Sequence, residues 1–409
     1  MVHSRFLVVG CGDTGTALGL NLARQGHKVY GLRRHPESLP GPIEPIQADL
    51  TRKQTLTSLP DNLAVVFFLA APAARTEQAY RAIYVDGLRH LLEAIDEQGR
   101  APRRLFLVSS TSVYGQRNGE WVDETSPAQP RCFTGRILLE AEEMVARHPI
   151  AWTIFRAGGI YGPGRAQLLT RVREGTLAMP PKGPVYTNRI HRDDAAGALA
   201  FLAQLPGPES LYLGVDDEPC DLEAVARWLA RKMRVPLRIS RSEPGHSELS
   251  GAGKRCRNRK LRSTGYSFIY PTFREGYAAI LDEETAPRTG IILISHGTPL
   301  GRANERFERL VTQLASSFPG VDVAPAYLSS AHPTIDEQVL SLVSKGILRI
   351  LLLPYFLHAG THITQTIPRI IERVRGKHPG ASIELLPSLE SDPALLDLLI
   401  KRIHAALSQ

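Results

Sequence analysis

The sequence predicts an α/β protein made of two parallel-sheet units, and three observations lead to that prediction. Short apolar, β-branched runs alternate with helical patterns, which is typical of strands buried on both faces of a parallel sheet. At 409 residues the chain is longer than one hydrophobic core usually extends. The charged segment LDEETAPRTG (281–290) interrupts the alternation, so we expect a domain boundary there.

The first unit is expected to be a doubly wound parallel sheet spanning residues 1–282. An apolar strand at 4–10 leads into a helix that ends near Gln25. Further strands are expected at 27–34, 42–50, 64–71 and 103–115. Because helical patterns separate these runs, consecutive strands should lie parallel with helices on both faces.

A linker at 283–289 should lead to a second αβ series over 290–409, again a parallel sheet between helices. Its expected strands are 291–297, 321–328, 347–357 and 381–389. Its expected helices are 305–318, 334–346, 364–378 and 394–407. The sequence shows no short repeat and no low-complexity segment.

Composition indicates a cytoplasmic globular protein with reduced thiols. Hydrophobic residues make up 43% and charged residues 22% of the chain, and no apolar run approaches the length of about 18 residues that a transmembrane helix needs. The N-terminus enters a strand directly, unlike a signal peptide. Cys11, Cys132, Cys220 and Cys256 have no close pairing, so neither a zinc site nor a disulfide framework is expected.

The net charge of +8 is concentrated in GKRCRNRKLR, residues 253–262. No aromatic residues interleave this run and no nucleic-acid motif accompanies it, so we expect no nucleic-acid partner. A solvated basic surface, or one that meets an anionic small molecule, fits better.

A glycine-rich motif follows the first expected strand and opens the first expected helix. Its residues are Gly10, Gly12, Asp13, Thr14 and Gly15. In this context the glycines let the backbone approach a pyrophosphate, and the helix N-terminus offers free N–H groups. The alternative is a tight turn without a ligand.

Two arginines stand where an NAD-specific site usually carries an acid. They are Arg33 and Arg34. Their guanidinium groups suit the 2′-phosphate of NADP, unless they are surface charges one residue out of register.

Four motifs in order resemble the extended short-chain dehydrogenases of the NAD-dependent epimerase/dehydratase group. They are GCGDTG (10–15), SSTSVYG (109–115), RAGGIYGPGR (156–165) and NRIHRDD (188–194). The resemblance covers about 1–280. It implies a Rossmann domain that binds NADP or NAD, with Asp49 near the adenine end of the cofactor.

The chain departs from this family at its acid–base pair. Such enzymes usually carry Tyr-x-x-x-Lys, but Thr134 and Leu138 stand at the matching positions of TGRILLEAE (134–142). A conventional alcohol dehydrogenase or sugar epimerase is therefore not expected. Two interpretations remain, namely hydride transfer without a tyrosine and nucleotide binding without chemistry. Ser110 is expected to contact the cofactor or substrate, or to cap its strand.

Three histidines follow three expected strands of the second unit. They are His296, His332 and His362. Ligand sites of open αβ sheets gather at the carboxyl ends of strands, and a neutral imidazole binds a divalent metal or accepts a proton. A lone loop histidine would more often be solvated or capping, and His358 is expected to be merely exposed.

Residues 290–405 resemble the small sirohydrochlorin chelatases. The matching segments are LISHGTPLGRANERF, AYLSSAHPTIDEQV and ILLLPYFLHAGTHITQTIP. The resemblance implies that His296 and His362 handle the metal, that Fe²⁺, Co²⁺ or Ni²⁺ is the metal substrate, and that the protein is a homodimer. Two family carboxylates are replaced here, by His332 and by Thr366. His332 remains able to accept a proton or bind a metal, so we include it with the catalytic histidines. The alternative is an inactive relative.

Together the halves suggest a bifunctional enzyme of siroheme or cobalamin synthesis. The first unit would oxidise precorrin-2 to sirohydrochlorin with NAD(P), and the second would insert the metal. Oxidation of a reactive macrocycle does not need a Tyr/Lys pair. The basic run 253–262 could meet the substrate carboxylates in the first unit, and Arg302, Arg306 or Lys345 could do so in the second. Alternatives are a nucleotide-binding regulatory module, an epimerase or reductase with an unrelated substrate, and simple metal storage.

Overall fold

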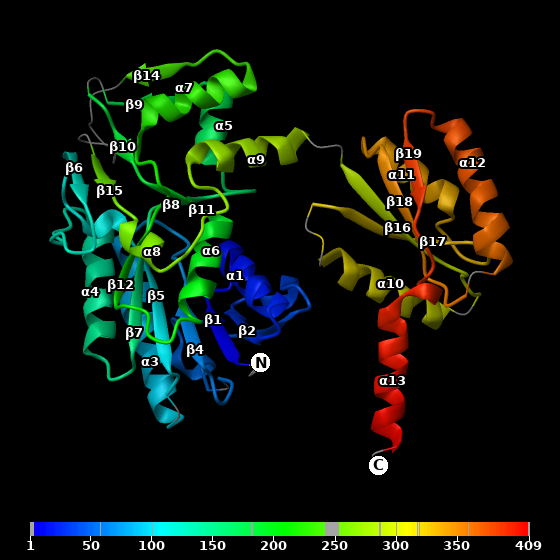
Figure 1. Cartoon of the computed structure of the whole chain (residues 1–409), viewed down its shortest axis with the longest axis horizontal. Coiled ribbons are helices and arrows are strands. Elements are labelled where there is room, and N and C mark those ends of the chain that lie inside the picture. Colours follow the sequence, from blue (N-terminus) through cyan, green and yellow to red (C-terminus); the bar gives the residue numbers. More distant parts are fainter. Residues whose placement is uncertain are drawn as a thin grey trace. The chain divides into compact units, whose positions relative to one another are not determined.

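The computed structural model describes residues 4–407 except 58, 100, 181–182, 242–252, 286–287, 300, 317, 319 and 359. The chain divides into two compact units, Met1–Glu284 and Thr285–Gln409 (Figure 1). The segment 283–289 was expected to be a linker, but helix α9 (Phe273–Thr285) and strand β16 (Thr289–Ser295) occupy its two ends.

A seven-stranded parallel sheet forms the centre of the first unit, as the sequence predicted. Its strands are β1 (Arg5–Val9), β2 (Lys28–Arg33), β3 (Ile43–Gln47), β4 (Val65–Phe68), β5 (Arg104–Ser110), β7 (Trp152–Ala157) and β12 (Leu211–Gly214). Their order is β12-β7-β5-β4-β1-β2-β3. The direction of strand addition reverses between β1 and β4, so a crevice is expected at their carboxyl ends.

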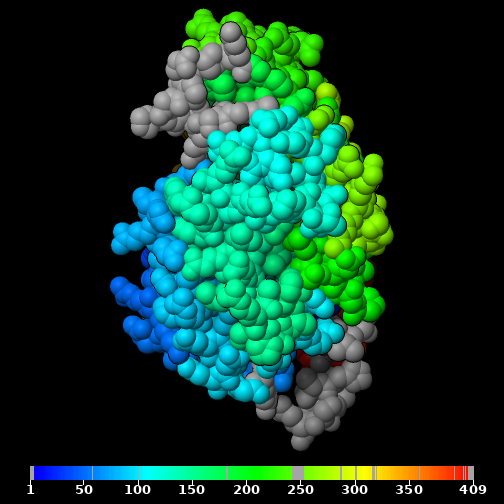
Figure 2. All heavy atoms as spheres, turned by 90° about the vertical axis from the view of Figure 1, so that its left-hand side faces the viewer, coloured from blue at the N-terminus to red at the C-terminus, as the bar shows by residue number. Residues whose placement is uncertain are grey.

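Helices cover both faces of this sheet. Helices α1 (Asp13–Arg24) and α6 (Arg192–Leu202) pack on one face, and α3 (Leu88–Glu97) and α4 (Phe133–Arg147) pack on the other. Along β1, Phe6 and Val8 enter the first layer and Leu7 and Val9 the second. Both layers are apolar, which explains the continuous apolar run of this strand. The blue-green surface in the middle of Figure 2 belongs to the region of α4.

Short strands build a small lobe beside the carboxyl ends of the large sheet. One sheet contains β13 (Cys220–Asp221), β10 (Tyr186–Thr187), β15 (Gly253–Cys256) and β6 (Asn118–Val122). Two further pairs are β11 (Arg189–His191) with β8 (Gly159–Tyr161), and β14 (Ile239–Arg241) with β9 (Leu177–Met179). Helices α5 (Gln167–Glu174), α7 (Leu222–Met233) and α9 share the apolar core of this lobe, whereas the short α8 (Arg259–Ser263) packs with α1 and α6. The sequence did not predict these strands, because two to five residues carry too little periodicity.

The second unit is a four-stranded parallel sheet between helices, as predicted. Its strands are β16, β17 (Asp322–Tyr327), β18 (Arg349–Pro354) and β19 (Ser382–Leu385), in the order β17-β16-β18-β19. Its helices are α10 (Gly301–Ser316), α11 (Ile335–Ser344), α12 (Ile367–Lys377) and α13 (Pro393–Leu407). The first strand, β16, lies inside the sheet between β17 and β18.

Helix α13 extends away from the sheet of the second unit (Figure 1). Its exposed apolar side chains are Leu396, Leu398, Ile400 and Ile403. Within the described part of the chain, no helix has both the length and the apolarity to cross a membrane.

Candidate functional site

The loop between β1 and α1 brings its backbone unusually close to its neighbours. Gly10 has a φ of +83°, and a Cβ there would lie 2.3 Å from the backbone of Ala70. A Cβ on Gly15 would lie 2.9 Å from the carbonyl oxygen of Gly10. Only glycine fits the first position, and helix α1 begins directly afterwards at Asp13. The loop therefore presents the open N-terminus of a 12-residue helix to the crevice.

A cavity of about 370 Å³ lies at this loop. The residues predicted to bind the cofactor line it, except for Ser110: Gly10, Gly12, Asp13, Thr14, Gly15, Arg33, Arg34 and Asp49. The hydroxyl oxygen of Thr14 is buried there without a hydrogen-bond partner among the described residues. An unpaired buried hydroxyl is costly, and a bound polar ligand would satisfy it. The glycine loop with its open helix N-terminus and the unpaired hydroxyl of Thr14 both fit a bound dinucleotide.

Two arginines line this cavity, Arg33 at the end of β2 and Arg34 directly after it. Arg33 donates a hydrogen bond of 3.3 Å to the carbonyl oxygen of Cys11. Asp49 accepts hydrogen bonds from the backbone N–H (3.0 Å) and hydroxyl (2.8 Å) of Thr51. Burial raises the pKa of Asp49, but these bonds and the charge of Arg34 outweigh it and lower the pKa overall. The carboxylate is therefore ionised near neutral pH, and the charges of Arg34 and Arg52 favour that state.

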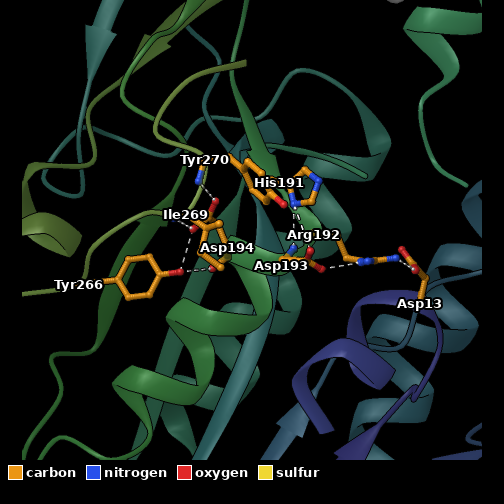
Figure 3. A network of polar contacts seen from close by, with 8 residues as sticks. All are labelled: Asp13, His191, Arg192, Asp193, Asp194, Tyr266, Ile269 and Tyr270. Atoms are coloured by element: carbon orange, nitrogen blue, oxygen red, sulfur yellow. Dashed lines mark hydrogen bonds and ion pairs between the residues drawn. The ribbon is translucent and has the colours of Figure 1, made fainter. Parts of the chain in front are cut away.

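An ion pair ties the glycine loop to the start of α6. Arg192 contacts Asp13 at 3.1 Å and Asp193 at 2.9 Å (Figure 3). The backbone N–H of Asp193 donates to Nδ1 of His191 at 3.2 Å. The Nδ1 atom is thus an acceptor, and His191 caps α6. This network fixes the start of α1 against a segment about 180 residues later in the chain.

His191 is buried in an aromatic environment. Its ring centroid lies 5.3 Å from that of Tyr161 and 4.0 Å from that of Tyr270. Its Nε2 atom has no hydrogen-bond partner among the described residues. Burial lowers the pKa of His191 to about 4, so the ring is neutral near pH 7 and serves as a cap.

A second cavity of about 900 Å³ adjoins the first. Thr14 and Arg165 belong to the walls of both. Ser110 was predicted to bind the cofactor or substrate, but it lines the second cavity and not the first. Its hydroxyl also accepts from the backbone N–H of Ser112 at 3.1 Å, which caps a short helical turn. Ser110 therefore both lines the second cavity and caps the short helical turn that follows its strand.

The helix that should carry the acid–base pair carries a buried ion pair instead. Thr134 and Leu138 are both buried in α4, and Leu138 lines the second cavity. One turn further, Glu142 pairs with Arg156 at 2.6 Å and accepts a hydrogen bond of 2.6 Å from Ser109. Neither Thr134 nor Leu138 can act as an acid or base near neutral pH. The helix therefore contributes packing and a structural ion pair.

Residues of the basic run 253–262 are absent from the described lining of the second cavity. Lys254 donates to the carbonyl oxygen of Tyr114 at 3.2 Å. The guanidinium groups of Arg255 and Arg257 lie 4.8 Å and 5.0 Å from the ring centroid of Trp121. No aromatic residue interleaves this run in the sequence, but the fold places Trp121 against two of its arginines. The expectation that this run meets a substrate in the first unit therefore stays a prediction, which the lining of this cavity does not support.

The second unit brings two of its predicted histidines together. The ring centroids of His296 and His362 are 4.5 Å apart and the rings are nearly perpendicular, at 89°. Phe356 packs edge-on against His296 at 5.5 Å. His296 follows β16, and His362 opens the helical turn that precedes α12. Both rings are exposed, so their lone pairs are accessible to an ion arriving from solvent.

Backbone contacts hold the end of β16 in place. The N–H and hydroxyl of Ser329 both donate to the carbonyl oxygen of His296, at 3.0 Å and 3.2 Å. Gly297 has a φ of +79°, and a Cβ there would lie 2.2 Å from the carbonyl oxygen of Ser329. This close approach requires glycine and fixes the direction in which His296 leaves the strand.

His332 and His358 stand apart from this pair. Nδ1 of His332 lies 2.9 Å from a carboxylate oxygen of Glu337, and 78% of its side chain is exposed. His358 is 87% exposed. Over the described ranges, no three His, Cys, Asp or Glu side chains are arranged to hold a metal ion. His332 therefore adds no third metal ligand to His296 and His362 in this structure.

The folds and sites define a dinucleotide-binding αβ unit joined to a smaller αβ unit with a histidine pair. A family model described as NAD(P)H-binding matches residues 10–205. A solved structure provisionally named an NAD-dependent epimerase/dehydratase, from Methylobacillus flagellatus, is 35% identical with a TM-score of 0.59. That match covers 69% of this chain and 99% of the other. A 3-diazoavenalumate denitrifying reductase of a Streptomyces species is 27% identical over 66% of this chain and 98% of the relative.

The smaller unit matches a different family. A model described as CbiX covers residues 290–406. The sirohydrochlorin cobaltochelatase of Methanosarcina acetivorans is 29% identical over 29% of this chain and 98% of the relative. The chain belongs to the NAD(P)-binding epimerase/dehydratase-like proteins through its N-terminal unit, which is fused to a CbiX chelatase domain.

Proposed function

We propose that the second unit inserts a divalent metal ion, Fe²⁺, Co²⁺ or Ni²⁺, into sirohydrochlorin. The observation that carries this proposal is the placement of His296 and His362, whose rings lie 4.5 Å apart at neighbouring strand ends. The match to CbiX across the whole unit supports it. Metal storage would require a closed ligand set, whereas two exposed imidazoles can release an ion as well as bind it.

The reaction requires a metal ion to enter the macrocycle and two pyrrole N–H protons to leave. In the proposed mechanism His296 and His362 hold the incoming ion through neutral imidazole nitrogens and accept the departing protons. Phe356 restricts the rotation of His296 by packing against its edge.

Metal insertion by the intact chain tests this assignment. With sirohydrochlorin and Co²⁺, we expect His296→Ala and His362→Ala to lower the insertion rate by at least about 100-fold. His358→Ala is the matched control, since it removes an exposed histidine from the same region, and its rate should stay within about twofold of the native rate. If both test variants retain the native rate, the proposed roles are wrong.

We further propose that the first unit oxidises precorrin-2 to sirohydrochlorin. A nicotinamide cofactor, when bound, supplies a hydride acceptor, and the substrate loses one hydride and one proton. The glycine loop would hold the pyrophosphate, and Arg33 and Arg34 favour NADP because their guanidinium groups match a 2′-phosphate. The absence of an acid–base pair at Thr134 and Leu138 is compatible with this reaction, which deprotonates no alcohol.

A reductase with another substrate is the second candidate, and the likeness to the Streptomyces denitrifying reductase favours it. The two candidates predict opposite directions of hydride flow. Incubation of the intact chain with precorrin-2 and NADP⁺ or NAD⁺ should produce the absorbance of sirohydrochlorin. No spectral change with either cofactor would exclude the oxidation and leave the reductase.

We also propose that the protein is a homodimer. The apolar side chains exposed on α13 support this proposal, because Leu396, Ile400 and Ile403 recur at helical spacing along one side of the helix. Sedimentation equilibrium should give about 90 kDa, twice the 45.0 kDa of one chain. Leu396→Glu together with Ile403→Glu should shift the mass toward the monomer, and an unchanged mass would place any interface elsewhere.

A further inference from the structure

The charged residues that line the second cavity of the first unit are all positive. Its arginines are Arg75, Arg165, Arg171 and Arg189, and its described lining contains neither aspartate nor glutamate. Within the described parts of the chain, Arg165 and Arg171 form no ion pair. Several cations that share one cavity repel each other unless an anion lies between them.

Arg189 differs from the other three because it is buried. It lies on β11 and is 6% exposed, whereas the other three are exposed at the rim. Its Nη1 atom has no hydrogen-bond partner among the described residues. A buried guanidinium donor without a partner is costly, so this group is poised for an acceptor that enters the cavity.

The nearest buried acid does not cancel the charge of Arg189. Asp216 is 1% exposed, and its Oδ2 atom has no partner among the described residues. Burial raises the pKa of Asp216 to about 8, although the charge of Arg189 opposes this rise. Near pH 7 the carboxyl group is therefore mostly protonated, and the charge of Arg189 remains available.

We propose that this cavity binds an organic anion carrying several carboxylate or phosphate groups, and that Arg189 recognises one of these groups at the floor of the cavity. Arg165 and Arg171 contact the other groups at the rim. The volume of about 900 Å³ accommodates a ligand much larger than a simple sugar. Arg165 lines both cavities, so the anion lies next to the cofactor.

This inference rests on the proposed function in one respect: the cavity is assigned to a substrate because it adjoins the proposed cofactor site. It does not depend on which substrate is oxidised or reduced. It also differs from the expectation that the run 253–262 binds the anion, because the arginines involved come from β11, the last turn of α5 and the segment before that helix. The test therefore uses unreactive anions, so that its failure is distinct from failure of precorrin-2 oxidation.

Titration calorimetry on the intact chain, saturated with NADP⁺, measures binding of two probes. Mellitate presents six carboxylates, and fructose 1,6-bisphosphate presents two phosphates. We expect one site per chain for at least one probe, and the probe that binds more tightly identifies the preferred anionic group. Arg189→Gln should weaken that binding at least tenfold, and Arg171→Gln should weaken it severalfold.

Arg147→Gln is the matched control, because Arg147 is exposed on α4 and paired with Glu143. Its affinity for either probe should equal that of the native chain. NADP⁺ affinity, measured on every variant, reports whether the first unit is folded. Arg171 is exposed, so its variant tests the site even if Arg189→Gln does not fold. Absence of binding by both probes, or equal affinity in the native chain and in both test variants, would overturn the proposal.

Discussion

Neighbouring residues on one helix have very different energetic roles. Glu142 is buried and holds Arg156 and Ser109, whereas Glu143 faces solvent and pairs with Arg147. A buried charge that loses its partner costs about 3–5 kcal/mol, because the remaining ion stays desolvated. An exposed pair contributes about 0–1 kcal/mol. Position relative to the sheet therefore decides what each carboxylate does.

Replacement of these two glutamates tests that difference. We expect Glu142→Gln to lower the free energy of unfolding of the first unit by about 3 kcal/mol or more. Glu143→Gln should change it by less than about 0.5 kcal/mol. Urea denaturation followed by tryptophan fluorescence measures both, since Trp152 lies on the same strand as Arg156. Equal effects of the two substitutions would contradict a structural role for the buried pair.

His191 should make the first unit sensitive to acid. Its pKa is about 4 in the folded protein and about 6.5 for an ordinary histidine. Between these values the unfolded chain binds a proton that the folded chain does not. The free energy of unfolding should therefore fall as the pH decreases from 6.5 to 4, by up to about 3 kcal/mol.

A variant is needed to isolate the contribution of His191, because Asp216 changes the unfolding free energy with pH in the opposite direction. Its raised pKa stabilises the folded state most at low pH, and that contribution decreases as the pH rises toward 8. His191→Asn keeps a side-chain acceptor at the helix cap and removes the imidazole. We expect the unfolding free energies of the native chain and the variant to diverge between pH 6.5 and 4. Parallel curves would show that His191 does not titrate in this way.

At the scale of elements, the turn between β1 and α1 depends on backbone space. A Cβ on Gly10 would lie 2.3 Å from the backbone of Ala70, at a φ of +83°. Backbone strain and overlap of this kind cost about 1–3 kcal/mol each. Gly41 also lies in a loop, but a Cβ there would meet no atom within 4 Å.

Alanine at these two glycines should therefore have different effects. We expect Gly10→Ala to destabilise the first unit by at least about 2 kcal/mol and to weaken NADP⁺ binding at least tenfold. Gly41→Ala should change stability by less than about 0.5 kcal/mol. Denaturation midpoints and calorimetric titration with NADP⁺ measure the two effects. Native-like cofactor affinity in Gly10→Ala would show that the turn tolerates a side chain.

The sequence predicted the elements whose signals are local. The apolar run of β1 and the glycines after it lie within 15 residues, so their pattern is sufficient to predict the strand, the turn and the helix. His296 and His362 were also foreseen, because parallel strands deliver their carboxyl ends to one edge. Arg165 and Arg189 were part of quoted motifs, but no role could be assigned to them. Their shared cavity depends on the small lobe, whose short strands pair across large sequence separations.

On the scale of the whole molecule, the two units have separate cores. Apolar clusters around Leu7, Phe67 and Leu199 belong to the first unit, and those around Ile294 and Phe307 belong to the second. A unit with its own core can fold without its neighbour. The predicted division near residue 285 thus remains a proposal that separated halves can test.

Expression of residues 1–284 alone should give a first unit of unchanged stability. All three tryptophans, Trp121, Trp152 and Trp228, lie in this unit, so their fluorescence reports its unfolding in the intact chain as well. We expect the two urea midpoints to agree within about 0.3 M, which corresponds to less than about 1 kcal/mol. A lower midpoint for the fragment would mean that the second unit stabilises the first.

The buried surroundings of Leu138 constrain how this fold could regain the chemistry of its relatives. Leu138 packs in one cluster with Tyr114. The hydroxyl oxygen of Tyr114 accepts a hydrogen bond of 2.8 Å from Arg156, and its backbone carbonyl oxygen accepts one of 3.2 Å from Lys254. A lysine at position 138 would add a further cation to the surroundings of Tyr114, where Arg156 already lies over the ring, at 4.9 Å from its centroid. Placing Tyr and Lys at positions 134 and 138 by two substitutions alone should therefore bring a buried charge into an already cationic cluster. A chain redesigned to carry that dyad would therefore need compensating changes at the buried Glu142–Arg156 pair as well.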